Sequence, residues 1–300
     1  MKILNFGSAN LDYVYRLDHI VMEGETEQSE EMNIFAGGKG LNQSVAAAKA
    51  GARVYHAGCI GSDGQILIDI LKESGVDMSL INYSDKKNGH AVIQVGKNGE
   101  NSIFLYSGTN AMIGREYVDT VLGSFDKDDI LILQNEINNI RYIIDAAYKK
   151  GMFIILNPSP INDDILEIDF NKISCLVVNE TEAKAVLGDI DAQHIKETVK
   201  EEYPNMKVML TRGGKGSCFI DGDMIYKQSA YNVKAVDTTA AGDTFMGYFV
   251  AGISNGDKIE DILKCASAAA AIAVSRNGAA PSIPYISEVK EKLNLMNSSL

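Results

Sequence analysis

Short apolar segments alternate with helical segments along most of this sequence, and this alternation limits the fold more than any other feature. It is typical of parallel strands joined by helices, so we predict a three-layer αβα core with a mostly parallel sheet covered on both faces. The predicted strands are Lys2–Gly7, Arg53–Ile60, Ile130–Leu133, Phe153–Leu156, Cys175–Val178 and Lys207–Leu210, and the predicted helices include Gly64–Ser74, Ile137–Lys150, Thr181–Leu187 and Ala192–Tyr203.

Two segments rich in β-type residues interrupt this alternation. They span residues 13–35 and 90–106, and the second contains Asn98-Gly99, a strong signal for a tight hairpin turn. Because neither segment fits the parallel layer, we predict a small β-sheet beside it, inserted as a lid. The αβα core would then consist of residues 1–12, 36–89 and 107–300.

Charge and cysteine content narrow the range of partners and compartments. The net charge is −12, which argues against nucleic acid or an anionic membrane as a partner. The four cysteines show neither zinc-ligand nor redox spacing, so free thiols in a reducing compartment are expected. No signal-like apolar core opens the sequence and no apolar run reaches the length of a membrane span. We expect a cytoplasmic protein.

The stretch Asp237-Thr-Thr-Ala-Ala-Gly-Asp-Thr-Phe245 places small residues and two carboxylates just before a helical segment. If Ala241–Asp243 open the helix, their free N–H groups and the positive helix end form an anion site. Asp243 would then lie beside the anion, where a carboxylate suits the role of a base for an attacking hydroxyl. The alternative is an ordinary N-cap and tight turn, which use the same residue types.

Polar residues follow several of the predicted strands at their carboxyl ends, where open α/β sheets bind ligands. They are Asn10, Asp12, Asn135, Glu136, Asn157, Asn179-Glu-Thr-Glu182 and Thr211-Arg-Gly-Gly-Lys-Gly216. Each alone could merely cap a helix or turn. The tetrapeptide Gly-Gly-Lys-Gly occurs twice, at residues 37–40 and 213–216, but neither copy continues as a Walker A loop, and no dinucleotide fingerprint follows the first strand.

Together these motifs resemble the ribokinase-type (PfkB) carbohydrate kinase family over essentially the whole chain. The resemblance rests on Ala36-Gly-Gly-Lys-Gly-Leu-Asn-Gln-Ser-Val-Ala46 and on the stretch from Asp237 to Phe245, in the order and separation of the family. It implies a ribokinase-like αβα fold whose β lid often joins two subunits, so a homodimer is expected. ATP, Mg²⁺ and K⁺ are the implied cofactors.

The resemblance also implies roles for individual residues. Asp243 would remove the proton from a sugar hydroxyl while the amides of Ala240, Ala241 and Gly242 hold the transferred phosphoryl group. Sugar-binding positions are matched by Asn10, Asp12, Gly38, Lys39, Asn42, Glu136 and Asp243. Nucleotide-binding positions are matched by Asn179, Thr211, Gly213, Gly216, Gly242 and Ser267. Glu182 would order magnesium through water, and potassium would be held by Asp237 and Ser282 with carbonyls of Thr239, Ala273, Arg276 and Gly278.

Two positions depart from the family pattern: Ser267 stands where a larger His or Asn is frequent, and Leu41 replaces the more usual Ala. Within the family, Gln43-Ser44 after Asn42 resembles the members that act on free sugars more than the sugar-phosphate kinases, and Asn10 with Asp12 fits a small pentose with adjacent hydroxyls. The leading expectation is ATP-dependent phosphorylation of D-ribose at its 5-hydroxyl. Another furanose sugar or a nucleoside is the alternative substrate. A non-catalytic sugar-binding module is a third reading, which an intact Asp243 disfavours, and the missing dinucleotide fingerprint disfavours an oxidoreductase.

Overall fold

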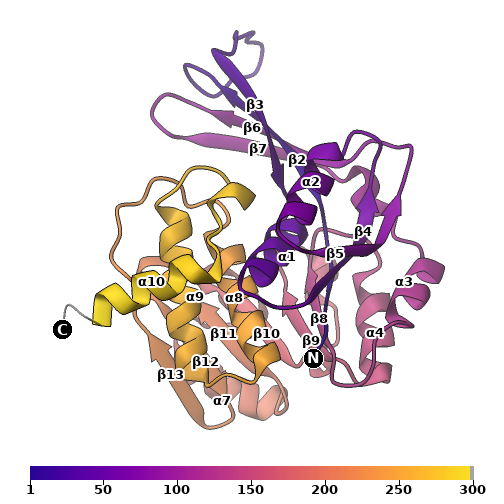
Figure 1. The fold of residues 1–300 in the computed structure, drawn as a ribbon, viewed down its shortest axis with the longest axis vertical. Coiled ribbons are helices and arrows are strands. Elements are labelled where there is room, and N and C mark those ends of the chain that lie inside the picture. The colour runs from indigo at the N-terminus through magenta and orange to yellow at the C-terminus, as the bar shows by residue number, and fades with distance from the viewer. Residues whose placement is uncertain (298–300) are drawn as a thin grey trace.

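The computed structural model describes residues 1–297 and contains two separate β-sheets (Figure 1). The larger has nine strands in the order β13-β12-β11-β10-β9-β8-β1-β4-β5, and only β12 and β13 run antiparallel to their neighbours. The predicted fold class is therefore confirmed. The strands are β1 (Ile3–Phe6), β4 (Val54–Ile60), β5 (Asp77–Tyr83), β8 (Ile130–Gln134), β9 (Phe153–Asn157), β10 (Cys175–Asn179), β11 (Lys207–Thr211), β12 (Ser217–Asp221) and β13 (Met224–Gln228).

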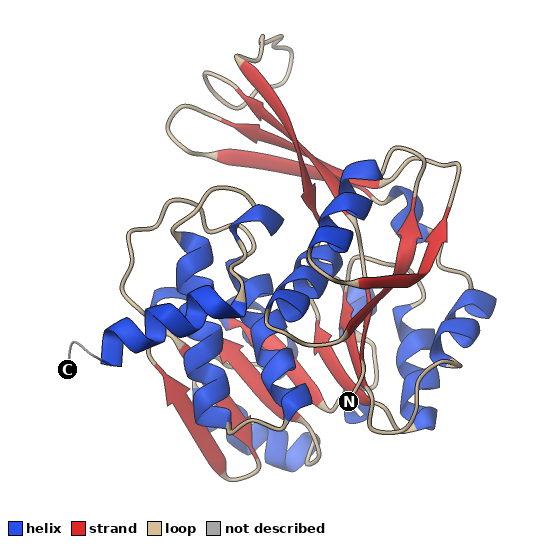
Figure 2. Ribbon diagram, in the orientation of Figure 1, coloured by secondary structure: helices blue, strands red, loops and turns tan. Residues whose placement is uncertain are grey.

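Helices cover both faces of this sheet (Figure 2). Successive strand residues point to opposite faces, so Leu131 and Leu133 pack under α3–α7 while Ile130 and Ile132 pack under α8, α9 and α10. The helices are α1 (Lys39–Lys49), α2 (Gln65–Glu73), α3 (Arg115–Leu122), α4 (Ile140–Lys150), α5 (Asp163–Leu166), α6 (Glu180–Leu187), α7 (Ala192–Glu202), α8 (Ala241–Asn255), α9 (Ile259–Val274) and α10 (Ile286–Asn297). Within residues 1–297, no helix combines the length and hydrophobicity that a membrane crossing needs.

The smaller sheet has four strands in the order β3-β2-β6-β7 and projects from the core (Figure 1). Its strands are β2 (Asn10–Arg16), β3 (Glu31–Gly37), β6 (Gly89–Val95) and β7 (Asn101–Tyr106). The predicted small sheet is thus present, but β2 begins at Asn10 and β3 ends at Gly37, so the sheet extends closer to the core than residues 13–35. Elements β5 and α3 were not predicted, and α4 begins at Ile140 rather than at Ile137.

Helices α1 and α8 cross with their backbones in close contact at Gly247 of α8 and Ala46 and Ala47 of α1. A Cβ added to Gly247 would overlap the Cβ of Ala46 and lie 2.6 Å from the amide nitrogen of Ala47. Glycine on α8 and alanines on α1 therefore allow the two helix backbones to touch. Since Asp243 lies one turn before Gly247 on the same side of α8, this crossing carries its side chain to the first turns of α1.

We predict that Gly247→Ala lowers the free energy of unfolding by about 1–3 kcal/mol, because the added methyl overpacks the crossing. Without the clash, the same change within a helix would stabilise by about 1 kcal/mol. Urea unfolding is the measurement. Gly214→Ala is the control, because nothing lies within 4 Å of its added Cβ and its φ is not positive. A Gly247→Ala protein as stable as the control would contradict the close crossing.

Candidate active site

The first turn of α1 is capped by the protein itself. The Lys39 amide donates to Glu136 Oε2 at 2.9 Å, the Gly40 amide donates to the Ser8 hydroxyl, and the Leu41 amide donates to the Ser8 carbonyl. The Ser8 hydroxyl in turn donates to Glu136 Oε2. Because these amides already have acceptors, the Gly-Gly-Lys-Gly turn at residues 37–40 is not an anion site.

The first turn of α8 is more open by contrast, although its Ala241 amide donates to the Thr238 carbonyl at 3.3 Å. Ala240 precedes the helix with φ of 59°, Gly242 is exposed, and a Cβ added to Gly242 would meet nothing within 4 Å. Amides at a helix start have no partner within the helix, and the helix dipole adds positive potential there. The predicted helix start at Ala241 is therefore present, with room for an anion in front of it.

The carboxylate of Asp243 is held by two amide side chains from α1. Asn42 Nδ2 donates to Oδ2 at 3.1 Å, and Gln43 Nε2 donates to Oδ1 at 2.9 Å. Asp243 lines a cavity of about 220 Å³ together with Lys39, Glu182 and Gly242. The cavity lies in front of α8, so the carboxylate borders open space and is not enclosed by the interior.

Acidic groups crowd this region around a single lysine. Burial raises the pKa of Asp12 to about 7, and the negative charges of Glu136 and Asp243 add to the shift. Burial also raises the pKa of Glu136, although hydrogen bonding from Ser8 and the charge of Lys39 oppose it. Burial disfavours the Lys39 ammonium, but Asp243, Glu136 and Glu182 outweigh that effect and raise its pKa. Lys39 therefore remains charged among the carboxylates.

A second cavity, of about 710 Å³, is bordered by Glu136, one of the carboxylates near Lys39. Asn10 and Glu136 line it together with Tyr106 at the end of β7 and Asn110 in the turn that follows. Asn110 Nδ2 donates to Asn10 Oδ1 at 2.6 Å and so orients Asn10. Asp12 lines neither cavity, but it lies close enough to Glu136 and Asp243 for their negative charges to raise its pKa.

Only some of the residues predicted to bind the nucleotide line the smaller cavity. Asn179 and Thr211 line the smaller cavity. Gly213, Gly216 and Ser267 do not line it: Ser267 is buried within α9, and Gly216 has φ of 93° with no room for a Cβ beside the Gln228 carbonyl. Gly216 is thus required by its own turn whether or not a ligand binds there.

The Asn179-Glu-Thr-Glu182 motif forms a capping box at the start of α6. The Glu182 amide donates to Asn179 Oδ1 at 2.9 Å, and Glu182 Oε2 accepts from the Asn179 amide at 3.0 Å. Asn157 Nδ2 also approaches Glu182 Oε2, at 3.4 Å. The carboxylate is 8% exposed and borders the smaller cavity, so oxygen chemistry suited to hydrated Mg²⁺ faces the space beside Asp243.

The predicted potassium residues belong to two chain segments that are joined by hydrogen bonds. Asp237 Oδ1 accepts from the Thr239 amide at 2.8 Å and Oδ2 accepts from the Gly278 amide at 3.0 Å. Burial opposes its ionisation, but these bonds lower its pKa, so the carboxylate is charged. The Ala273 carbonyl accepts from the Arg276 amide, and the Ser282 hydroxyl donates to the Ala279 carbonyl. A carboxylate among carbonyls fits a hard monovalent cation in donor type.

Sequence reasoning gave no contact in the site to several residues that hold it together: Asn157 was named only among the polar residues at strand ends, and Gln43 only as part of a motif. Ser8, Gln43 and Asn157 contact Glu136, Asp243 and Glu182 respectively. They lie next to predicted site residues or at a strand end, so position in the chain was the available signal. Asn110 had no such signal, because it meets Asn10 only through the fold.

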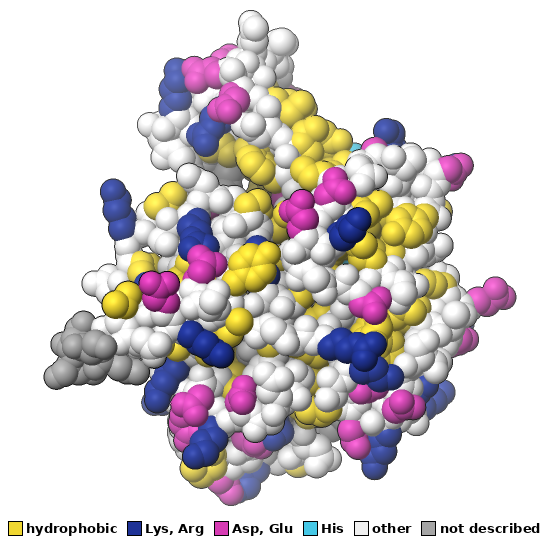
Figure 3. Space-filling view, in the orientation of Figure 1, with side chains coloured by type: hydrophobic (Ala, Val, Ile, Leu, Met, Phe, Trp, Pro, Cys, Tyr) yellow, Lys and Arg dark blue, Asp and Glu magenta, His cyan; other side chains and the backbone are white. Residues whose placement is uncertain are grey.

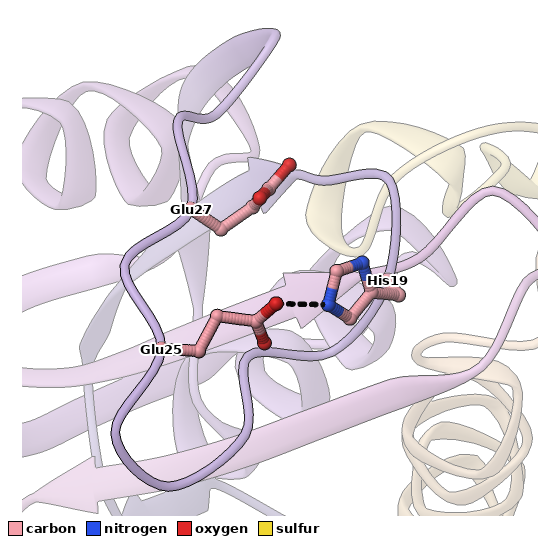
Figure 4. Close-up of side chains that lie close together, drawn as sticks. All are labelled: His19, Glu25 and Glu27. Carbon is pink, nitrogen blue, oxygen red and sulfur yellow. Dashed lines mark hydrogen bonds and ion pairs between the residues drawn. The ribbon is translucent and has the colours of Figure 1, made fainter.

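One further cluster lies in the loop between β2 and β3, in the small sheet. Figure 4 shows His19 Nε2 facing Glu25 Oε1 at 2.8 Å, with Glu27 nearby. This bond closes the loop and, first among its causes, raises the pKa of His19.

An open helix start, a carboxylate held beside it and a lysine between further carboxylates are features that suit a phosphotransferase. A family model described as pfkB family carbohydrate kinase matches residues 1–286. The chain is 35% identical over 300 residues to a ribokinase from Haemophilus influenzae, with 96% of both chains covered. The chain therefore belongs to the pfkB family of carbohydrate kinases.

Solved structures agree with this assignment. Ribokinase from Cryptococcus neoformans var. grubii in complex with ADP has a TM-score of 0.86 at 32% identity, covering 97% of this chain and 99% of that one. Arabidopsis thaliana ribokinase complexed with ribose and ATP has a TM-score of 0.82 at 29% identity, covering 97% of each chain.

We predict that Asp12 keeps its proton to about pH 7. The folded state then binds a proton that the unfolded chain releases near the ordinary value of 3.8, so this group's contribution to stability falls as pH rises between those values. Carbon-13 NMR of labelled aspartate carboxyls measures the titration, and Asp12→Asn assigns the signal.

Glu136→Gln should lower the Asp12 midpoint, because it removes the second-largest cause of the shift. The exposed Asp128→Asn change is the control and should leave the midpoint in place. An Asp12 signal that titrates near 3.8 in the wild-type protein would show that the carboxyl is not buried among these charges.

Proposed function

We propose that this protein transfers the γ-phosphoryl group of ATP to the 5-hydroxyl of D-ribose. The observation that carries the proposal is the placement of Asp243 at the open start of α8, held by Asn42 and Gln43 beside a cavity. The similarity to ribokinases over nearly the whole chain supports both the nucleotide and the sugar.

In the proposed reaction Asp243 accepts the proton of the sugar hydroxyl, whose oxygen attacks the γ-phosphorus. The bond from that phosphorus to the bridging oxygen breaks, and ADP leaves with its electron pair. The amides of Ala240, Ala241 and Gly242 stabilise the charge on the transferred group, and the Ala241 amide would share its donor with the Thr238 carbonyl, which lies at 3.3 Å. The Lys39 ammonium adds a positive charge to the same space.

The sugar would be bound by residues on both sides of Glu136: Asn10, Asp12, Gly38, Lys39, Asn42 and Glu136. Asn42 supports this assignment directly, because its Oδ1 atom is buried and has no hydrogen-bond donor within residues 1–297. A buried acceptor without a donor costs free energy, and a sugar hydroxyl would satisfy it.

The nucleotide would lie along Asn179, Thr211, Gly213, Gly216, Gly242 and Ser267, with Glu182 ordering Mg²⁺ through water. The magnesium neutralises phosphate charge when it is bound, and the cavity between Glu182 and Asp243 is where it would be held. Removing divalent cations with EDTA should abolish turnover, and persisting turnover would exclude this role for Glu182.

The alternative substrates are another furanose sugar or a nucleoside. A panel of ribose, 2-deoxyribose, fructose and adenosine at equal concentration, each assayed with ATP for ADP release, tests the choice. The highest kcat/KM should be obtained with ribose. Much faster turnover of adenosine or fructose would overturn the ribose assignment while leaving the kinase chemistry intact.

We also propose that the small sheet joins two copies of the chain. Figure 3 shows hydrophobic side chains exposed along it, and β7 contributes Ile103, Phe104, Leu105 and Tyr106, each more than half exposed. Strands β3 and β7 both have a free edge. Light scattering should give twice the mass of one chain; a monomer at micromolar concentration would contradict the dimer. The net charge of −12 disfavours nucleic acid and anionic membranes as partners, and the four free thiols suit the cytoplasm.

Asp243→Asn should lower kcat by about 10²–10⁴, the usual effect of losing a general base. Sugar affinity should change little, because the amide keeps the shape of the side chain. Steady-state kinetics and calorimetry with ribose measure the two quantities. Asp128→Asn is the matched control at an exposed position. Unchanged turnover in Asp243→Asn would remove this residue from the mechanism.

Potassium should raise kcat more than sodium does, because the carbonyl donors near Asp237 suit the larger cation. The comparison uses equal concentrations of potassium and sodium chloride at constant ionic strength. Asp237→Asn should reduce the difference between the two salts. Equal rates in both salts with the wild-type protein would mean that the loop is only structural.

A further inference from the structure

A continuous chain of buried polar side chains runs from Asp243 into the core. Gln43 Nε2 donates to Asp243, and Gln43 Oε1 accepts from Gln134 Nε2 at 2.7 Å. Gln134 Nε2 also donates to Asn5 Oδ1 at 3.0 Å, and Asn5 Nδ2 donates to the Ser44 hydroxyl at 2.9 Å. Ser44 then meets His56 Nδ1 at 2.8 Å.

These five side chains are essentially inaccessible to solvent. Each is at most 1% exposed. They come from α1 and from three neighbouring strands of the large sheet, β4, β1 and β8. Two polar atoms of these side chains, Gln134 Oε1 and His56 Nε2, have no hydrogen-bond partner within residues 1–297, and burying such atoms costs free energy. Glycine at position 7 leaves space for one of these side chains, because a Cβ added there would collide with Gln134 Oε1.

The donors and acceptors along the chain have one consistent direction. Because Gln134 offers a donor to Gln43 Oε1, the NH₂ group of Gln43 must face Asp243. The opposite orientation of the Gln43 amide would bring its oxygen against the carboxylate and its NH₂ group against that of Gln134. Burial lowers the pKa of His56 to about 4, so the far end of the chain is a neutral ring. None of the five hydrogen-bonded side chains is charged, so Asp243 carries the only charge in this series of hydrogen bonds.

We propose that Gln134 is a positioning residue for phosphoryl transfer: it orients the Gln43 amide, which holds the carboxylate of Asp243 toward the acceptor hydroxyl. This inference rests on the proposed role of Asp243. Gln134 touches neither Asp243 nor any cavity described here, and acts only through Gln43. With Asn42 on the other oxygen, both carboxylate oxygens have an amide donor, and the group cannot rotate without losing one.

The test is Gln134→Met, which keeps the length of the side chain and removes the donor. We expect kcat at saturating sugar to fall about 10- to 100-fold, the scale of a misplaced reacting group, with the sugar KM changed less than threefold. The acid limb of the kcat–pH profile should move to higher pH, because a carboxylate that loses a fixed donor binds its proton more tightly.

The other charged groups that face Asp243 are unchanged in this variant. They are Lys39 on α1, Asp12 on β2, Glu136 after β8 and Glu182 on α6. Ile143→Val, on the buried face of α4, is the control for a loss of stability alone and should leave the acid limb in place.

Gln43→Met removes the direct donor and should produce the same shift, and it also serves if Gln134→Met fails to fold. The double variant should be no slower than Gln43→Met alone, because Gln134 acts through Gln43. Additive losses, or an acid limb that does not move in either single variant, would overturn the inference. If Asp243→Asn itself retains full activity, the proposed function fails instead, so the two failures are distinguishable.

Discussion

The active site depends on the short distance between α1 and α8. Gly247 allows the two helices to touch at Ala46 and Ala47, and Asp243 lies one turn earlier. At this separation the carboxylate comes within hydrogen-bond distance of Asn42 and Gln43. A wider crossing would leave two α1 amides and one α8 carboxylate facing each other across a gap that water would fill.

The N-terminal turns of α1 and α8, which both lie near the site, differ in whether their amides have acceptors within the protein. Glu136 and Ser8 accept hydrogen bonds from the first-turn amides of α1, so these amides are not available to a ligand. The start of α8 is left open beside exposed Gly242. Both helix starts carry the same dipole. In α8 the Ala241 amide donates to the Thr238 carbonyl at 3.3 Å, but exposed Gly242 still leaves that helix start better able than α1 to stabilise an external anion. In the proposed reaction, this difference would separate the phosphate side of the site from the sugar side.

The sequence predicted the fold class, and it named Lys39, Glu182 and Asp243, which the structure brings to one cavity, because the signals were local. The alternation of strands and helices, and the two motifs around Gly37–Gly40 and Asp237–Phe245, are contiguous in the chain. Three features were out of reach. Asn110 meets Asn10 across 100 positions, and Gln134 meets Gln43 only where β8 passes under α1. Gly216 matched a nucleotide position, whereas its own turn already requires glycine.

The extent of β2 has a consequence for how the sugar is admitted. Asn10 and Asp12 lie within that strand, and the side chain of Asp12 covers Gly37 of the neighbouring strand. They are therefore part of the small sheet, while Glu136 and Asp243 belong to the core. Any tilt of that sheet as a rigid unit separates Asp12 from the two carboxylates that help it retain its proton. Opening would thus release a proton to the solvent near neutral pH, and closing would bind one again.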